Sequence, residues 1–218
     1  MAACGELSTF AHTRVEQIFF CNPNMMNPME TEKQKAAAGL LYDANHDATL
    51  LRERMDCAVM LHAFNHLSPA DESGRQTLLR RLLGRMGERS VILSPFQCDY
   101  GYNIEMGDDT FVNVGCVMLD GARITLGNHV FVAPCCGFYT AGHPLDVEQR
   151  NQGLEVALPI TVADDVWIGG HVCVLPGVSI GRGSVIGAGS VVNRSIPEGV
   201  LAAGNPCRVI RQLTELTA

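Results

Sequence analysis

The sequence is poor in aromatic residues and has no long apolar run. One tryptophan and four tyrosines stand against 22 glycines in its 218 residues. No segment approaches the roughly 20 apolar residues of a membrane-spanning helix, and residues 1–28 lack the basic start and apolar core of a signal peptide. These absences predict a cytoplasmic protein with no membrane partner, in which residues 1–28 form an N-terminal extension of unassigned order.

Positive charge is also scarce. The chain has 16 Lys and Arg residues against 23 Asp and Glu residues, which gives a net charge of -7. Sequence-independent binding to nucleic acid or anionic lipid needs clustered basic residues. We therefore expect no nucleic-acid partner, although a local basic patch for a phosphorylated cofactor is compatible with this charge.

The nine cysteines follow no spacing typical of redox or zinc sites. They are scattered along the chain, and the adjacent Cys135 and Cys136 do not form a C-x-x-C motif. Buried and reduced thiols are the better interpretation, because this is how cysteines behave in the cytoplasm.

Residues 29–86 predict a small helical module. Their apolar residues are compatible with a 3.6-residue period, though irregularly spaced. A third helix is expected to start at Ser68-Pro69, because a capping residue followed by proline is a helix-start signal. Its apolar face would carry Leu78, Leu79, Leu82, Leu83 and Met86. Short helices bury little surface alone, so the module must pack on another domain.

Residues 87–218 contain a six-residue period, typical of a parallel β-helix. Its clearest first positions are Ile168, Val174, Ile180, Ile186 and Val192. The fifth positions are small or β-branched, namely Val172, Val178, Ser184, Ser190 and Ile196. Upstream, Met106, Val112 and Met118 keep the spacing, which shifts by two residues before Leu126.

Three six-residue edges make one triangular coil whose first-position side chains stack inside. We therefore predict a mainly β protein: a left-handed parallel β-helix with a small N-terminal helical module and one extruded loop. The alternative, an ordinary β-sandwich, would show alternation with turns every 8–12 residues.

The period is interrupted once, between residues 140 and 160. The insert contains Gly142-His143-Pro144 and a polar run from Asp146 to Asn151. An insert of this length in a regular coil must leave it as a loop, and such loops often carry function.

Several motifs occur in a fixed order along the chain. They are Ala38-Gly39-Leu40-Leu41-Tyr42-Asp43, Tyr100-Gly101-Tyr102-Asn103, Phe111-Val112-Asn113, Thr140-Ala141-Gly142-His143-Pro144, Val166-Trp167-Ile168-Gly169-Gly170 and the ending from Ala202 to Arg211. Together with the hexads, they resemble the maltose and galactoside O-acetyltransferases from about residue 29 to the C-terminus. A bare hexapeptide repeat would indicate only the superfamily.

The resemblance implies direct transfer of acetyl from acetyl-coenzyme A to a sugar hydroxyl, in a homotrimer with active sites between subunits and without a metal. It also implies a histidine general base, at the position of His143. A neutral imidazole suits this role near neutral pH, whereas a lone loop histidine would otherwise be a surface residue. The same resemblance assigns Asn113, Asp43 and Asp99 to the sugar. Asn113 could instead be a structural asparagine within a coil.

The resemblance further assigns a set of residues to coenzyme A. They are Trp167, Gly170, Ala188, Asn193, Arg194, Arg208 and Arg211. Arginine suits phosphate because its guanidinium can bind two oxygens at once. The alternative is that these arginines only solvate the exposed end of the coil stack.

Phe111, Gly121 and Glu155 differ from the residues common in the galactoside branch, so the identity of the acceptor stays open. An antibiotic hydroxyl, a decorated oligosaccharide and the amino group of a nucleotide sugar are competing acceptors. A zinc carbonic anhydrase on the same fold would need three histidine ligands, and the histidines from His129 to His171 lack close pairing. A non-catalytic scaffold would not need the loop that carries His143.

Overall fold

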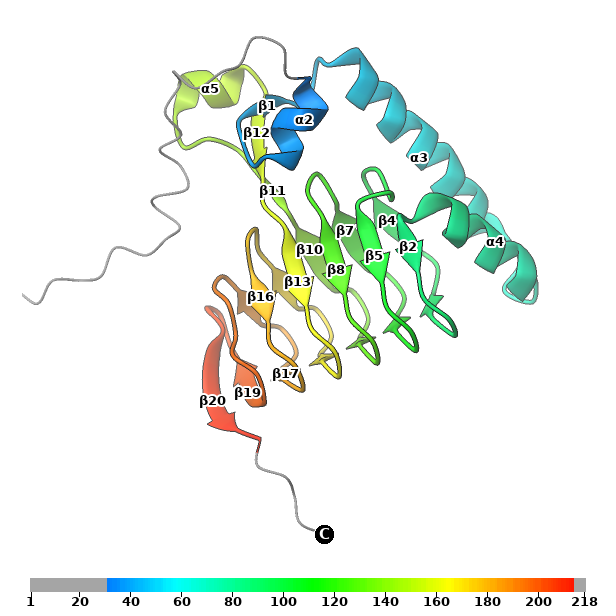
Figure 1. Cartoon of the computed structure of the whole chain (residues 1–218), viewed down its shortest axis with the longest axis vertical. Coiled ribbons are helices and arrows are strands. Elements are labelled where there is room, and N and C mark those ends of the chain that lie inside the picture. The colour runs from blue at the N-terminus through cyan, green and yellow to red at the C-terminus, as the bar shows by residue number, and fades with distance from the viewer. Residues whose placement is uncertain (1–30, 214–218) are drawn as a thin grey trace, which may run out of the picture.

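The computed structural model describes residues 31–213, and its main body is a parallel β-helix with three flat faces (Figure 1). Face 1 consists of β2 (Arg85–Met86), β5 (Ile104–Met106), β8 (Ile124–Leu126), β13 (Ile160–Val162) and β16 (Ser179–Ile180). Face 2 consists of β3 (Val91–Ile92), β6 (Phe111–Val112), β9 (Phe131–Val132), β14 (Trp167–Ile168), β17 (Val185–Ile186), β19 (Val200–Ala203) and β20 (Arg208–Gln212). Face 3 consists of β4 (Gln97–Cys98), β7 (Val117–Leu119), β10 (Gly137–Tyr139), β15 (Cys173–Val174) and β18 (Val191–Val192). Only β20 runs antiparallel to its neighbour in these faces, and the predicted mainly β fold is confirmed.

The register of the hexads is confirmed by burial. The first-position residues Ile168, Val174, Ile180, Ile186 and Val192 are each at most 1 % exposed. Ile168 pairs in parallel with Val132 below it and with Ile186 above it, so the apolar side chains of successive coils form one continuous core.

The β-helix begins earlier than predicted. Strand β2 lies inside the segment 29–86 that was assigned to the helical module, and the first coil continues to Cys98. Met86, Ile92 and Cys98 keep the six-residue spacing, but the next inward residue, Met106, follows after a longer step. This irregular step hides the first coil from a search for hexads.

The corner between faces 3 and 1 is wider in the first coils than in the later ones. The step from Met118 on face 3 to Leu126 on face 1 takes two residues more than the step from Val174 to Ile180. This widening accounts for the shift noticed before Leu126. The extra residues form an enlarged corner, beside which the inserted loop leaves the coil.

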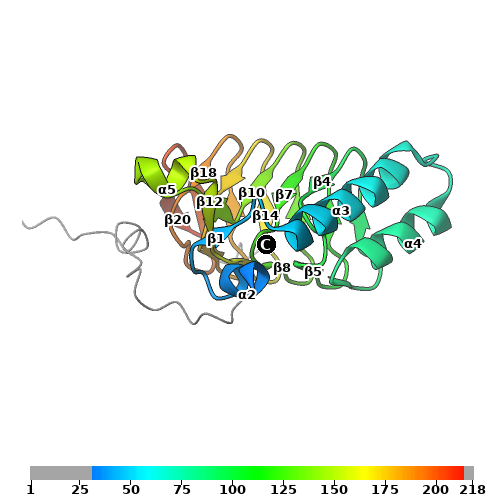
Figure 2. The ribbon, with the colours of Figure 1, turned by 90° about the horizontal axis from the view of Figure 1, so that it is seen from above.

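The helical module contains α2 (Glu32–Ala37), β1 (Tyr42–Asp43), α3 (Ala48–His66) and α4 (Glu72–Leu82). Buried Leu61 and Phe64 of α3 join the core of the first coil, whereas Leu50 packs in a second cluster with Tyr42 and Tyr100. Figures 1 and 2 show α3 and α4 beside the first coil, and α2 and β1 beside the inserted loop. The expected packing of this module on the second domain is therefore confirmed.

The predicted start of the third helix is wrong. Ser68 and Pro69 form a turn, in which the Asp71 N–H donates to the Ser68 carbonyl at 3.0 Å. The helix begins at Glu72, because the Asp71 carboxylate caps it by accepting from the Gly74 N–H at 2.9 Å. Met86 accordingly lies in β2 and not on the helix.

The segment from 140 to 160 leaves the coil, as predicted, and forms β11 (Ala141–Gly142), α5 (Val147–Asn151) and β12 (Leu154–Ala157). Strand β12 pairs antiparallel with β11 on one side and with β1 of the helical module on the other. The loop is thus joined to the module by a three-stranded sheet, which fixes its position beside the corner between face 3 and face 1.

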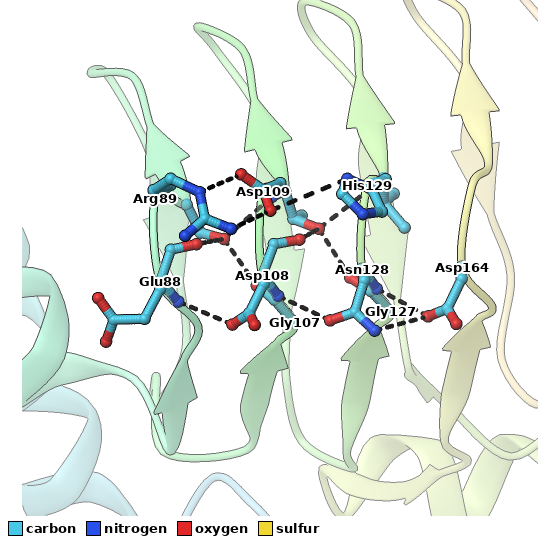
Figure 3. A network of polar contacts seen from close by, with 12 residues as sticks. Glu88, Arg89, Gly107, Asp108, Asp109, Gly127, Asn128, His129 and Asp164 are labelled. Atoms are coloured by element: carbon cyan, nitrogen blue, oxygen red, sulfur yellow. Dashed lines mark hydrogen bonds and ion pairs between the residues drawn. The ribbon is translucent and has the colours of Figure 1, made fainter.

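The corner between faces 1 and 2 is built by a ladder of short polar side chains (Figure 3). The Asn128 carboxamide oxygen accepts from the Asp108 N–H, and the Asp164 carboxylate accepts from the Asn128 N–H, each at 2.8 Å. Asp109 and His129 turn this corner with positive φ, of 54° and 53°, which Asp and His tolerate better than most residues. His129 therefore has a structural role at this corner.

Three further expectations concern the N-terminal extension, membrane-spanning helices and the cysteines. The N-terminal extension, residues 1–28, lies outside the described residues. Within residues 31–213, no helix is long and apolar enough to cross a membrane. The seven described cysteines are free, but Cys135 is exposed, against the expectation that the thiols are buried, because it occupies an outward turn with φ of 60°.

Candidate active site

A cavity of about 210 Å³ lies where the enlarged corner, the inserted loop and the helical module meet. Its lining residues are Tyr42, Arg54, Asp99, Tyr100, Leu119, Ala141, Gly142, His143 and Glu155. The cavity brings together His143 and Asp99, which the sequence predicted as base and acceptor contact. Parts of the chain that are more than 100 residues apart contribute to it, through β1 and β12.

His143 follows β11 directly and is held by the neighbouring strand of the loop. Its Nδ1 atom lies 3.0 Å from the backbone oxygen of Leu154 in β12. A carbonyl oxygen only accepts, so Nδ1 carries the donated hydrogen, and in the neutral ring Nε2 keeps the free lone pair. The side chain is exposed, so Nε2 is able to take a proton from a bound molecule.

Asp99 follows β4 at the enlarged corner, directly above the buried Asp120. The Asp120 carboxylate accepts from the backbone N–H groups of Asp99 at 2.9 Å and Tyr100 at 2.8 Å. Burial, and then the negative charge of Asp120, raise the pKa of Asp99 to about 6, although Arg54 opposes the shift. The negative charge at this end of the cavity is therefore only partly compensated.

Tyr42 and Glu155 are cross-strand partners in the sheet that joins β1 to β12. The Tyr42 hydroxyl donates to Oε2 of Glu155 at 3.0 Å, and Tyr42 is 2 % exposed. Burial, and then the Glu155 carboxylate, raise the pKa of Tyr42, so its hydroxyl stays protonated and acts as a donor. This contact connects the helical module to the wall of the cavity.

Asp43 is not among the residues that line the cavity. Its carboxylate accepts from the backbone N–H groups of Asn45 at 3.1 Å and His46 at 2.9 Å, and it also lies 3.1 Å from Nδ1 of His46. These contacts hold the turn after β1. This turn ends close to the loop. The predicted role of Asp43 at the acceptor stays a prediction.

Asn113 and His143 lie at opposite edges of face 3. Asn113 follows β6, at the corner from face 2 to face 3, whereas the loop with His143 follows β10, at the far end of the same face. Gly170 and Ala188 follow β14 and β17 and so share the corner of Asn113. The Gly189 N–H donates to the Gly170 carbonyl at 2.8 Å, which stacks these turns directly on one another.

The predicted coenzyme A residues lie toward the end of the β-helix that is distant from α3. Trp167 lies on face 2 and is 56 % exposed. Arg208 is exposed and donates to the side-chain oxygen of Asn193 at 3.3 Å, so these two residues meet. Arg194 and Arg211 are also exposed. The exposed guanidinium groups fit a phosphate ligand, because they are not tied up in ion pairs within residues 31–213.

The sequence did not identify several residues that surround His143. Arg54, Tyr100 and Asp120 belong to the cavity or to its floor, and the Leu154 carbonyl orients His143. The longer step between Met118 and Leu126 was the available signal, because it marks where the corner enlarges. No sequence signal indicated the backbone contact of Leu154.

Within the described part of the chain, 31–213, no group of three or more His, Cys, Asp or Glu side chains is arranged to hold a metal ion. Tyr42, Asp99, His143 and Glu155, whose side chains all carry groups that form hydrogen bonds, lie together in the lining of the cavity.

Two family models match the chain. The maltose acetyltransferase hexapeptide capping motif matches residues 35–87, and the bacterial transferase hexapeptide model, with six repeats, matches residues 159–194. The first match covers most of the helical module and β2, the first strand of the β-helix. The second match covers the hexads with the clearest period.

Similar proteins span most of the chain. A Saccharomyces cerevisiae protein named "Putative acetyltransferase YJL218W" is 56% identical over 177 residues, which cover 81% of this chain and 90% of that protein. The crystal structure of a maltose O-acetyltransferase from Clostridium difficile 630 is 43% identical, with a TM-score of 0.83, and covers 85% of this chain and 99% of that one. A hexapeptide-repeat acetyltransferase from Vibrio cholerae, solved in complex with acetyl-coenzyme A, is 40% identical, with a TM-score of 0.79, and covers 85% of this chain and 100% of that one. The chain therefore belongs to the hexapeptide-repeat acetyltransferases that carry the maltose acetyltransferase capping motif.

Proposed function

We propose that this acetyltransferase moves the acetyl group of acetyl-coenzyme A to a hydroxyl of a sugar, such as a maltose-like, glucose-like or galactoside acceptor, with His143 as general base. The observation that carries the proposal is the contact between Nδ1 of His143 and the Leu154 carbonyl, which leaves the Nε2 lone pair of this cavity-lining residue free to act as a base. The acetyl-coenzyme A complex of the Vibrio cholerae relative supports the donor.

The proposed reaction uses this geometry. Nε2 of His143 takes the hydroxyl proton while the acceptor oxygen attacks the carbonyl carbon of the thioester. As the tetrahedral intermediate collapses, the carbon–sulfur bond breaks, and the imidazolium returns its proton to the leaving sulfur. General base catalysis of this kind contributes roughly 10²- to 10⁴-fold to the rate. The Leu154 carbonyl stabilises the imidazolium, because Nδ1–H donates to it throughout.

The coenzyme A site is assigned to the corner that carries Gly170 and Ala188 and to the basic end of the coil stack. A Cβ atom at Gly170 would meet only the Pro134 carbonyl, at 3.4 Å, so this turn is not crowded. Arg208 and Arg211 supply exposed cations for the phosphates, and Asn193 positions Arg208. Trp167 and Arg194 complete the predicted set.

The active site is assigned to the boundary between two subunits of a homotrimer. Asn113 and the coenzyme A corner lie across face 3 from His143 within one chain, so a neighbouring chain must bring the second set to the first. Face 2 also carries an exposed apolar stripe, in which Phe131 and Trp167 are cross-strand partners, 53 % and 56 % exposed. Stripes of this kind mark protein interfaces.

The acceptor is assigned to the cavity beside His143. Asp99 lines this cavity, and Asn113 of a neighbouring subunit and Asp43 complete the predicted acceptor contacts. Carboxylates and carboxamides suit a carbohydrate, because sugar hydroxyls both donate and accept. The free thiols of the described residues fit the proposed cytoplasmic location.

Release of free thiol from acetyl-coenzyme A tests the proposal. Purified wild type and His143→Ala are assayed with glucose, maltose, a galactoside, a chitooligosaccharide and chloramphenicol. We expect wild type to release thiol with one or more of the sugars, and His143→Ala to lose at least about 100-fold in kcat while keeping its circular dichroism spectrum. The exposed His62→Ala on α3 serves as the matched control and should retain full activity. Near-normal turnover by His143→Ala would contradict the assigned base.

A further inference from the structure

Two carboxylates on the wall of the His143 cavity have unused hydrogen-bonding capacity. Oε2 of Glu155 accepts from Tyr42, but within residues 31–213 no further donor reaches this carboxylate, and none reaches the carboxylate of Asp99. Both side chains are half-buried. Both carboxylates therefore keep oxygen atoms that can accept hydrogen bonds from a molecule in the cavity.

Tyr100 points to the same conclusion independently. It is 4 % exposed, lines the cavity, and its buried hydroxyl has no hydrogen-bond partner among the described residues. Burial raises the pKa of Tyr100 to about 12, so the hydroxyl remains protonated and available to a ligand oxygen. The wall therefore offers one donor and two acceptors beside the His143 imidazole.

Gly121 explains how Tyr42 reaches Glu155. A Cβ atom at Gly121 would lie 2.9 Å from the Tyr42 hydroxyl and 3.4 Å from Cβ of Ala157, so any side chain there would push Tyr42 away. Gly121 and Glu155, two of the positions at which the sequence departs from the galactoside branch, are thus parts of one arrangement. Glycine makes room for Tyr42, and Tyr42 fixes the Glu155 carboxylate in the wall.

The charge of the cavity is negative. Asp99 and Glu155 line it, and the buried Asp120 lies directly beneath Asp99. The one guanidinium in the lining, Arg54, donates to the Ala44 carbonyl and lies above the Tyr100 ring. An anionic acceptor would be repelled here, and a molecule with several hydroxyl donors would be bound.

Building on the proposed acetyl transfer, we propose that Glu155, held in place by Tyr42, is a specificity-determining residue of the acceptor site. Together with Asp99 it selects a neutral acceptor that carries two free hydroxyls besides the one that reacts. One hydroxyl donates to Asp99, one donates to the free oxygen of Glu155, and the third faces Nε2 of His143. Phosphorylated sugars and acceptors with a single hydroxyl are excluded.

Acceptor kinetics test this assignment. The thiol-release assay compares wild type, Glu155→Gln and Tyr42→Phe, with a neutral hexose, its monodeoxy analogues and the hexose 1-phosphate. Glu155→Gln turns one accepting oxygen into a donor, so we expect the acceptor KM to rise at least about tenfold, because buried partners are left unpaired. Tyr42→Phe should raise the same KM by a smaller factor. The KM for acetyl-coenzyme A should stay within about twofold of wild type in both variants.

Glu148→Gln is the matched control, because Glu148 is exposed on α5 of the same loop and does not line the cavity. It should behave as wild type. Unchanged acceptor KM in both Glu155→Gln and Tyr42→Phe, or a kcat/KM for the hexose 1-phosphate within tenfold of that for the hexose, would overturn the assignment while leaving acetyl transfer intact. A wild type that releases no thiol with any hydroxyl acceptor would instead refute the proposed function, and this assignment with it.

Discussion

The Nδ1 atom of His143 lies 3.0 Å from the backbone oxygen of Leu154. Leu154 in turn is the cross-strand partner of Asp43, in the short strand contributed by the helical module. The orientation of the imidazole thus depends on a strand that is anchored in a different part of the chain. The capping module is therefore a component of the candidate active site, in addition to covering the end of the β-helix.

Leu50→Ala tests this dependence. Leu50 is 2 % exposed and packs in the cluster with Tyr42 and Tyr100, so its loss leaves a cavity beneath β1. Truncations of this kind cost about 2–5 kcal/mol of stability, and we expect β1 and β12 to loosen, with kcat falling more than the affinity for acetyl-coenzyme A. The neighbouring Leu51 is 43 % exposed, and Leu51→Ala should change neither quantity. Chemical denaturation measures the stability, and steady-state kinetics measures kcat and the affinity for acetyl-coenzyme A. Equal effects of Leu50→Ala and Leu51→Ala would contradict the dependence of the imidazole orientation on the helical module.

The pKa of Asp99 gives the stability of the protein a specific pH dependence. Burial raises this pKa from 3.8 to about 6, so between these values the folded state binds a proton that the unfolded state has released. The contribution of Asp99 to stability is therefore lost as pH rises from about 4 to 6. Asp99→Asn removes the ionisable carboxyl group and with it this loss of stability. Above pH 6 the variant should therefore be more stable than wild type by about 1–2 kcal/mol after solvent screening. Urea denaturation at several pH values checks this; identical pH profiles would contradict it.

Gly121→Ala should damage the wall of the cavity. The added methyl group would lie 2.9 Å from the Tyr42 hydroxyl, in a place where Ala157 also leaves little room. Overpacking of this kind costs about 1–3 kcal/mol, and we expect a lower melting temperature and a higher acceptor KM. Gly142→Ala is the control for stability, since its Cβ would meet no atom within 4 Å. A Gly121→Ala variant as stable as Gly142→Ala would show that Tyr42 is not held as described.

Face 2 provides a test of the proposed homotrimer. Trp167→Glu places a charge in the middle of the exposed stripe, beside Phe131, where a neighbouring subunit would have to bury it. We expect the variant to sediment as a monomer and to lose activity, since each proposed active site needs two subunits. Thr77→Glu, at an exposed position of α4, is the control and should remain assembled. An active monomer would contradict an active site between subunits.

The β-helix could be predicted from the sequence because each coil repeats the same local requirement. Ile168 and Ile186 occupy equivalent positions in successive coils, and both are buried where the six-residue period places them. The interruption of that period located the loop of His143, whereas the role of His143 as base came from the resemblance of Gly142-His143-Pro144 to the acetyltransferases. In both cases the information lies within a few residues of the chain.

The wall of the cavity could not be predicted in this way. Tyr42 and Glu155 are 113 residues apart, and their contact depends on how the helical module lies against the loop. The start of the third helix was also misjudged, because Asp71 competes successfully with Ser68 as the capping residue. The first failure concerns a contact between distant parts of the chain, which only tertiary structure decides, and the second concerns a choice between two capping residues that lie close together in the sequence.

The basic end of the coil stack makes a separate prediction for the donor. Arg208→Ala removes an exposed guanidinium that Asn193 positions and that no ion pair within residues 31–213 occupies. Phosphates far from the reacting carbonyl contribute equally to binding the substrate and the transition state, so the KM for acetyl-coenzyme A should rise about tenfold while kcat stays unchanged. Arg182→Ala is the control, because Arg182 is exposed but is paired with Asp165 at 2.9 Å. Isothermal titration with coenzyme A measures the affinity directly, and equal affinities of the two variants would refute a phosphate contact at Arg208.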